Sequence, residues 1–129
     1  MLTLSDILSE NRATSRDAGY VHHAVSCSPF IARLFTKDAI LMNDSLENSH
    51  KEYQIQDMQN FLAAQKITDE TSLKRALRLL RQQVMARIIL RDLNGLADLQ
   101  EVMRTISNLA EVAVQVAIQH HSAWLAEQY

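Results

Sequence analysis

The fold is decided by residues 70–116, which read ETSLKRALRLLRQQVMARIILRDLNGLADLQEVMRTISNLAEVAVQV. Apolar residues recur there at steps of three and four on both sides of Asn94-Gly95, as they do along one face of an α-helix. Glycine tolerates the left-handed conformation that usually closes a helix, so the chain is expected to turn at Gly95. We therefore predict two long helices, over residues 70–91 and from residue 96 to the C-terminus, that pack antiparallel as an α-hairpin. The two apolar stripes consist of Leu73, Leu77, Leu80, Val84 and Ile88, and of Leu99, Val102, Ile106, Leu109, Ala113 and Val116.

Shorter helices are predicted before this hairpin. Residues 1–26 read as one or two short helices, and the next helix begins at Pro29 because Ser28 can accept a hydrogen bond from its first turn. Residues 43–51 are polar and predict a loop, whereas residues 53–66 predict an amphipathic helix. The sequence thus predicts an all-α fold, a helical bundle built on a long antiparallel α-hairpin with shorter N-terminal helices packed on it.

Length, charge and cysteine content limit the class of protein. At 129 residues the chain is the size of one domain, so we expect a single helical domain over residues 1–129. The formal net charge of -2 gives no overall attraction to nucleic acid or to an anionic membrane. Cys27 is the only cysteine, which suits a reducing compartment, and the sequence has neither a basic signal segment nor an apolar stretch of about 18 residues. We therefore expect a cytoplasmic protein that does not span a membrane.

No complete active site can be found in the sequence. The only glycines, Gly19 and Gly95, are isolated, so a glycine-rich phosphate loop is absent, and no Asp-x-Asp pair is present to hold magnesium. Histidines occur in adjacent pairs at residues 22–23 and 120–121, but consecutive residues of a helix point about 100° apart and would not share one ion. One histidine of each pair is expected to face solvent and the other to lie at the edge of the core. We predict no cofactor or metal site in this chain.

The first long helix holds six of the 13 basic residues of the chain. Lys74, Arg78 and Arg81 are expected to share one face of this helix. Arg87 and Arg91 lie one turn apart near its end, where positive charge complements the helix dipole. Three interpretations stay open: a solvated face, a docking surface for a protein or a neighbouring domain, and a nucleic-acid site, which the negative net charge disfavours. The candidate contact residues are Lys74, Arg78, Arg81, Arg87, Arg91 and Asp92.

Three segments resemble a known family. Residues 80–99 read LRQQVMARIILRDLNGLADL, which is similar to the stretch of glutamine synthetase adenylyltransferase that runs Arg, Met, Arg-Ile, Arg-Asp-Leu, Gly, Leu. Residues 106–111, ISNLAE, resemble that family's Leu-Ser-x-Leu-Ala-Glu, and residues 28–34, SPFIARL, resemble its early Ser-x-Phe-x-Ala segment. The chain departs from the family at Lys37-Asp38, where a proline is often found. The closer resemblance covers residues 73–129.

This resemblance implies a large bifunctional enzyme that attaches AMP to glutamine synthetase with one nucleotidyltransferase domain and removes it with another. ATP and magnesium are the implied cofactors of that parent enzyme, and glutamine synthetase and a nitrogen-signalling protein are its implied partners. No catalytic signature of the family matches a residue of this chain. The expected role is therefore that of a noncatalytic N-terminal helical region, whose partner is the deadenylylating nucleotidyltransferase domain of the same polypeptide.

A free-standing helical interaction module is the alternative hypothesis. Such a module would use the basic helix face to bind an acidic protein partner. Arg87, Arg91 and Asp92 lie within the segment that resembles the family, and we expect them either to form ion pairs that fix the helix turn or to dock the neighbouring domain. The sequence leaves open whether the chain is itself part of an enzyme.

Overall fold

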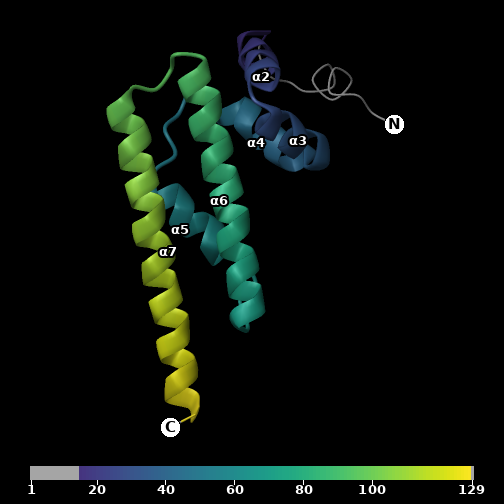
Figure 1. Ribbon diagram of the computed structural model, residues 1–129. Helices are drawn as coiled ribbons and strands as arrows, with labels where there is room; N and C mark the ends of the chain where they lie inside the picture. The colour runs from purple at the N-terminus through teal and green to yellow at the C-terminus, as the bar shows by residue number, and fades with distance from the viewer. Residues whose placement is uncertain (1–14, 129) are drawn as a thin grey trace.

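The computed structural model describes residues 15–128, and no strand occurs among them (Figure 1). The fold is all α, as the sequence predicted. The short helices expected over residues 1–26 are described only from Ser15, because residues 1–14 lie outside the described part of the chain. No helix within residues 15–128 is long and apolar enough to cross a lipid bilayer. The described helices are α2 (Ser15–Cys27), α3 (Pro29–Lys37), α4 (Ala39–Asn48), α5 (Ile55–Ala63), α6 (Glu70–Leu93) and α7 (Leu99–Gln128).

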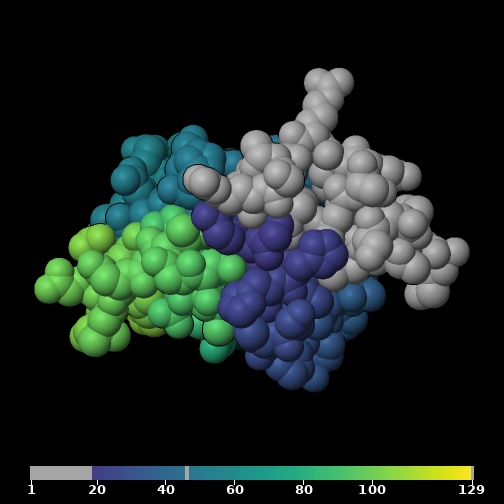
Figure 2. Space-filling model, turned by 90° about the horizontal axis from the view of Figure 1, so that it is seen from above, coloured from purple at the N-terminus to yellow at the C-terminus, as the bar shows by residue number. Residues whose placement is uncertain are grey.

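The central helix of the molecule is α6. It lies beside α7, the two helices run in opposite directions, and residues 94–98 connect them (Figure 1). One side of this pair is covered by α5, which packs against both helices, whereas α2 and α4 pack against α6. Seen from above, α2 adjoins the corner between α6 and α7 (Figure 2), where Asn94 Nδ2 donates a hydrogen bond of 2.9 Å to the carbonyl oxygen of Tyr20. Of the shorter helices, α2 and α4 therefore pack on α6, whereas α5 packs on both α6 and α7.

Two hydrophobic cores meet at α6. The first joins α2, α3 and α4 to the C-terminal half of α6, where Ala86 and Leu90 are buried. The second joins α5 and α7 to α6 through Leu80, Val84 and Ile88. Because α6 is buried in both cores, its apolar positions extend beyond the single stripe that is typical of a surface helix. The other buried members are Val21, Ala24, Ile31, Phe35, Leu41 and Met42 in the first core, and Tyr53, Met58, Leu62, Ala76 and Val112 in the second.

Side-chain caps and one glycine fix where the helices begin and end. Ser28 Oγ accepts a hydrogen bond of 3.3 Å from the first turn of α3, and Pro29 is the first residue of that helix, as predicted. Asp38 follows the last residue of α3 and caps α4, where its Oδ1 accepts a hydrogen bond of 3.0 Å from the N–H of Leu41. Gly95 follows α6 with a φ of 68°, the left-handed conformation expected there.

The loop predicted over residues 43–51 is wrong, because α4 continues through Asn48. Asp44 Oδ1 accepts a hydrogen bond of 3.1 Å from Asn48 Nδ2 one turn later in the same helix. The other carboxylate oxygen of Asp44 accepts hydrogen bonds from Gln83 and Arg87 of α6. Contacts with a distant part of the chain thus stabilise helical turns that the local polar composition disfavours.

The remaining helix boundaries differ from the predicted ones by a few residues. The helix predicted over residues 53–66 is α5, which is shorter at both ends, and the helix predicted over residues 70–91 is α6, which runs to Leu93. The last helix begins at Leu99 rather than at residue 96, because Asp98 Oδ1 accepts a hydrogen bond of 2.8 Å from a backbone N–H of its first turn.

Candidate docking surface and the ion pairs beneath it

Arg91 ties the end of α6 to two other parts of the chain. Its side chain is 8% exposed, and its Nε and Nη2 each donate a hydrogen bond of 2.8 Å to Glu101 of α7. Nη2 also donates to the carbonyl oxygen of Leu96, and Nη1 donates to that of Ser49, both at 2.9 Å. Two parallel bonds to one carboxylate give an arginine its strongest contact with an acid. Arg91 therefore links the end of α6 to Leu96 in the connecting segment and to Glu101 at the start of α7.

Arg87 lies one turn earlier, in a second polar network. Its Nη2 donates a hydrogen bond of 3.0 Å to Asp44, and its guanidinium carbon lies 4.4 Å from the centre of the Tyr53 ring. The Tyr53 hydroxyl donates to Gln83 Oε1 at 2.9 Å, and Gln83 Nε2 donates to Asp44 at 3.2 Å. Burial raises the pKa of Tyr53 above its ordinary value, although the positive charge of Arg87 acts in the opposite direction. The network joins α4 to α6 and leaves Arg87 buried.

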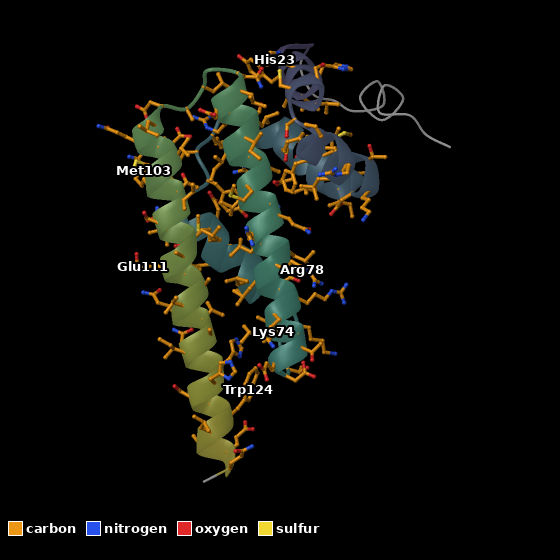
Figure 3. The ribbon with its side chains drawn as sticks, in the orientation of Figure 1. His23, Lys74, Arg78, Met103, Glu111 and Trp124 are labelled. Atoms are coloured by element: carbon orange, nitrogen blue, oxygen red, sulfur yellow. The ribbon has the colours of Figure 1, made fainter. Side chains whose placement is uncertain are left out.

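The other predicted basic residues, Lys74, Arg78 and Arg81, are exposed on α6. Lys74 forms an ion pair of 3.2 Å with Glu70, one turn before it in the same helix. Arg78 and Arg81 form no ion pair with any residue in the described range 15–128. Figure 3 shows Lys74 and Arg78 one turn apart along α6. The side chains of Arg78 and Arg81 are therefore available to a partner.

The predicted contact residues thus fall into a buried group and an exposed group, and the exposed group consists of Lys74, Arg78, Arg81 and Asp92. Arg87 and Arg91 are buried and bonded within the chain. Asp92 is exposed at the end of α6, where its carbonyl oxygen accepts a hydrogen bond of 3.1 Å from the N–H of Gly95. The structure does not bring the two groups together into one site, and the contact role of the exposed residues stays a prediction.

Arg78 and Arg81 border two hollows, which also share Met85 of α6. The hollow toward α7 has a volume of about 560 Å³, and the hollow toward α3 has a volume of about 440 Å³. No acidic residue of the described chain lines either hollow. The remaining lining residues are Leu77, Met85, Ile106, Leu109, Ala110 and Ala113 in the first, and Phe30, Gln82, Met85 and Ile89 in the second.

The sequence prediction missed an exposed apolar surface on α7. Leu99 and Ile106 were placed in the stripe that faces α6, but they are 72% and 45% exposed, whereas Val112 is buried. Met103 is also exposed, and Figure 3 shows it, with Glu111, at the edge of α7 that faces away from α6. The signal was that α7 has more apolar positions than one stripe can hold. We call this surface the outer face of α7; its residues are Leu99, Met103, Ile106, Val114, Ile118 and Leu125.

The histidine pairs differ in their surroundings. His22 and His23 are both exposed, so the expectation that one of them lies at the edge of the core is wrong. His120 is partly buried and His121 exposed, as expected, and the rings of both lie about 5 Å from that of Trp124 one turn on (5.5 and 5.2 Å between centres). Within residues 15–128 no three His, Cys, Asp or Glu side chains lie close enough together to hold a metal ion.

The chain is similar in sequence to much longer bacterial proteins. The bifunctional glutamine synthetase adenylyltransferase/adenylyl-removing enzyme of Nitrosomonas eutropha is 37% identical over 109 residues, which are 83% of this chain and 12% of the relative. The enzyme of the same name from Chromobacterium violaceum is 41% identical over 97 residues, which are 74% of this chain and 11% of the relative. The chain thus spans about an eighth of the length of these relatives. No solved structure matches it.

A family model agrees with these relatives. The model described as glutamate-ammonia ligase adenylyltransferase matches residues 19–129, which include every helix from α3 to α7 and most of α2. The segments that resemble this family in the sequence, residues 80–99 and 106–111, form the second half of α6, the corner and the middle of α7. The chain belongs to the glutamate-ammonia ligase adenylyltransferase family.

Proposed function

We propose that this chain is a noncatalytic helical region of the bifunctional enzyme that adenylylates and deadenylylates glutamine synthetase. Its role is to support the deadenylylating nucleotidyltransferase domain of that enzyme in the cytoplasm. ATP and magnesium serve the catalytic domains of the enzyme, and glutamine synthetase and a nitrogen-signalling protein bind to the enzyme as a whole. The family membership and the names of the relatives support this proposal.

The outer face of α7 is the observation that carries the proposal. From Leu99 to Leu125 this face is roughly 39 Å long at 1.5 Å per residue. Its large apolar side chains are 45% to 72% exposed. Large apolar side chains exposed along one helix in this way are typical of a site where another protein or domain binds. The relatives contain this region as about an eighth of their length, so a neighbouring domain of the same enzyme is the proposed partner.

Two ion pairs, one buried and one largely exposed, give α7 a fixed position. Arg91 holds the first turn of α7 through Glu101, and Arg104 of α7 donates a hydrogen bond of 2.8 Å to Glu52, in the segment before α5. The apolar core joins Val112 to α5 and α6 farther along the helix. A helix held at its start and its middle can present its outer face to a domain at a constant angle, which is what a supporting role requires.

A chimera tests this proposal. The chain replaces the matching segment of the Nitrosomonas eutropha enzyme, and both removal and attachment of AMP are measured on glutamine synthetase. The chimera is expected to remove AMP, and Val114→Glu with Ile118→Glu is expected to lower that rate by about tenfold while attachment of AMP is unchanged. Retained attachment shows that the polypeptide has folded.

The matched control for the chimera is Ser122→Glu with Gln128→Glu, which adds the same charge at two exposed positions of α7 outside the apolar set. It should leave both reactions unchanged. Equal removal rates for the double variant and the unmodified chimera would contradict a supporting role for the outer face. Heat of binding on titration of the isolated chain with ATP and magnesium would contradict its noncatalytic character.

Arg78 and Arg81 favour a second candidate, the interaction module that uses the basic face of α6. Both side chains are exposed, and neither forms an ion pair among the described residues. The two candidates use different surfaces, because the outer face of α7 contains neither arginine. Charge reversal at Arg78 and Arg81 in the chimera separates them: an unchanged removal rate is expected if α7 alone supports the catalytic domain.

A further inference from the structure

The α6–α7 pair is covered on one side only. On that side α5 packs against both helices, and Met58 and Leu62 enter the second core. On the other side no helix of the described chain crosses the pair (Figure 1). The hollow of about 560 Å³ is lined by residues of both α6 and α7. Three helices thus occupy three positions of a four-helix arrangement, with the fourth position open.

The open hollow has the apolar floor that a helix requires. Leu77 and Met85 line it from α6, and Ile106 and Leu109 line it from α7. Ala110 and Ala113 also line the hollow from α7. Small side chains allow a neighbouring helix to approach closely, while the larger ones provide apolar surface to bury.

The positive charge of the residues that border the hollow favours an acidic ligand. Arg78 and Arg81 border the hollow, both are exposed, and no described acidic residue lines it. Glu111, the nearest acidic residue in sequence to Ala110, lies at the far edge of α7 (Figure 3). Carboxylates beside the apolar face of an incoming helix would therefore meet arginines that have no competing partner within residues 15–128.

We propose that this open side of the α6–α7 pair binds one amphipathic helix with acidic residues beside its apolar face, presented by a separate protein. The proposal goes beyond the supporting role, which uses the outer face of α7, a surface that shares only Ile106 with the lining of the hollow. A second copy of the chain fits the site poorly, because a symmetric contact would oppose Arg78 and Arg81 to the same arginines. Nucleic acid fits poorly as well, because the floor of the hollow is apolar and the chain carries a net charge of -2.

Fluorescence anisotropy with synthetic peptides tests the site directly. The probe is a labelled helical peptide with leucines at helical spacing and glutamates flanking them; one control peptide has lysine for every glutamate, and another has the same residues in scrambled order. The glutamate peptide is expected to bind the full chain saturably, more weakly as salt is raised, and at least about tenfold more tightly than either control.

Substitutions locate the binding site. Arg78→Glu with Arg81→Glu should weaken binding of the glutamate peptide by about tenfold or more and should improve binding of the lysine peptide. Arg75→Glu is the matched control, because Arg75 is exposed on the same helix and does not line the hollow, and it should change affinity less than about twofold. Ala113→Trp, which fills the hollow, should block binding, and circular dichroism checks that each variant is folded.

Several results would overturn the proposal. They are equal binding of the glutamate and scrambled peptides, equal losses for Arg75→Glu and the double arginine variant, and displacement of the peptide by a DNA duplex. A dimer in light scattering that Ala113→Trp dissociates would assign the site to a second copy. The supporting role is tested separately, because Val114→Glu with Ile118→Glu should leave peptide binding unchanged.

Discussion

Arg91 and Glu101 stand ten residues apart in the sequence and meet through two hydrogen bonds of 2.8 Å across the corner between α6 and α7. The two side chains are only 8% and 14% exposed. Removing one member of a buried ion pair leaves the other charge without a partner and out of water. The pair is therefore a point at which single substitutions should have large effects on stability.

Arg91→Met is expected to lower the free energy of unfolding by about 3–5 kcal/mol, because it leaves Glu101 buried and alone. Adding Glu101→Leu should restore part of that loss, since the second change removes the unpaired carboxylate. Urea denaturation followed by circular dichroism measures both effects. Lys74→Ala, which breaks an exposed pair, is the control and should cost at most about 0.5 kcal/mol. If Arg91→Met lowers the free energy of unfolding no more than the control does, the stabilising role of the Arg91–Glu101 pair is contradicted.

The raised pKa of Tyr53 predicts that the folded chain loses stability at alkaline pH. Its pKa is raised in the folded chain by burial, so the folded state holds the phenolic proton more tightly than the unfolded state does. The stabilisation is present below the unfolded pKa of 10.0 and falls as the pH rises above it. Denaturation at increasing pH should show a steeper decline for the unmodified chain than for Tyr53→Phe. Parallel declines would show that Tyr53 ionises freely.

The lowered pKa of Asp69 predicts that the folded chain loses stability at acidic pH. Hydrogen bonds from the backbone N–H and then the side chain of Ser72 lower the pKa of Asp69 below its ordinary value of 3.8. Its contribution to stability is present above 3.8 and is lost as the pH falls through the lower, folded pKa. Thermal unfolding of Asp69→Asn should depend less on pH in that window than unfolding of the unmodified chain. Identical pH profiles would contradict the N-cap at α6.

Replacing each of the two glycines with alanine should change the stability of the chain in opposite directions. Gly95→Ala places a side chain at a φ of 68° and should cost about 1 kcal/mol, because only glycine adopts that conformation without strain. Gly19→Ala lies within α2, where an added Cβ would meet nothing within 4 Å, and should stabilise the chain by about 0.5–1 kcal/mol. Melting temperatures of the two variants test the pair. A shift in the same direction for both would disagree with these backbone assignments.

Local signals in the sequence predicted most of the helices. Ser28-Pro29 gave the start of α3, Asn94-Gly95 gave the end of α6, and spacing of three and four identified the long helices. These features act within a few residues of where they stand, so they can be read without the tertiary structure. The second half of α4 could not be read in this way, because Asp44 is held by side chains 39 and 43 residues away.

The candidate surface was predicted only in part, for a similar reason. The sequence placed the basic residues along the helix but did not show their burial: Arg87 and Arg91 are buried, whereas Arg78 and Arg81 are exposed. Which of them are buried depends on acids supplied by α4 and α7. The outer face of α7 was missed because periodicity shows that a helix has an apolar stripe but does not show how many neighbours that helix has.

Since α6 forms a wall of both hydrophobic cores, unfolding of α6 exposes apolar residues of both cores at once. Unfolding is therefore expected to be one cooperative transition, with no stable intermediate that retains only α2 to α4 or only α5 and α7. Amide hydrogens in the middle of α6 should exchange most slowly, at a rate set by the opening of the whole molecule. A chain organised in this way can tolerate change at its ends far better than in its central helix.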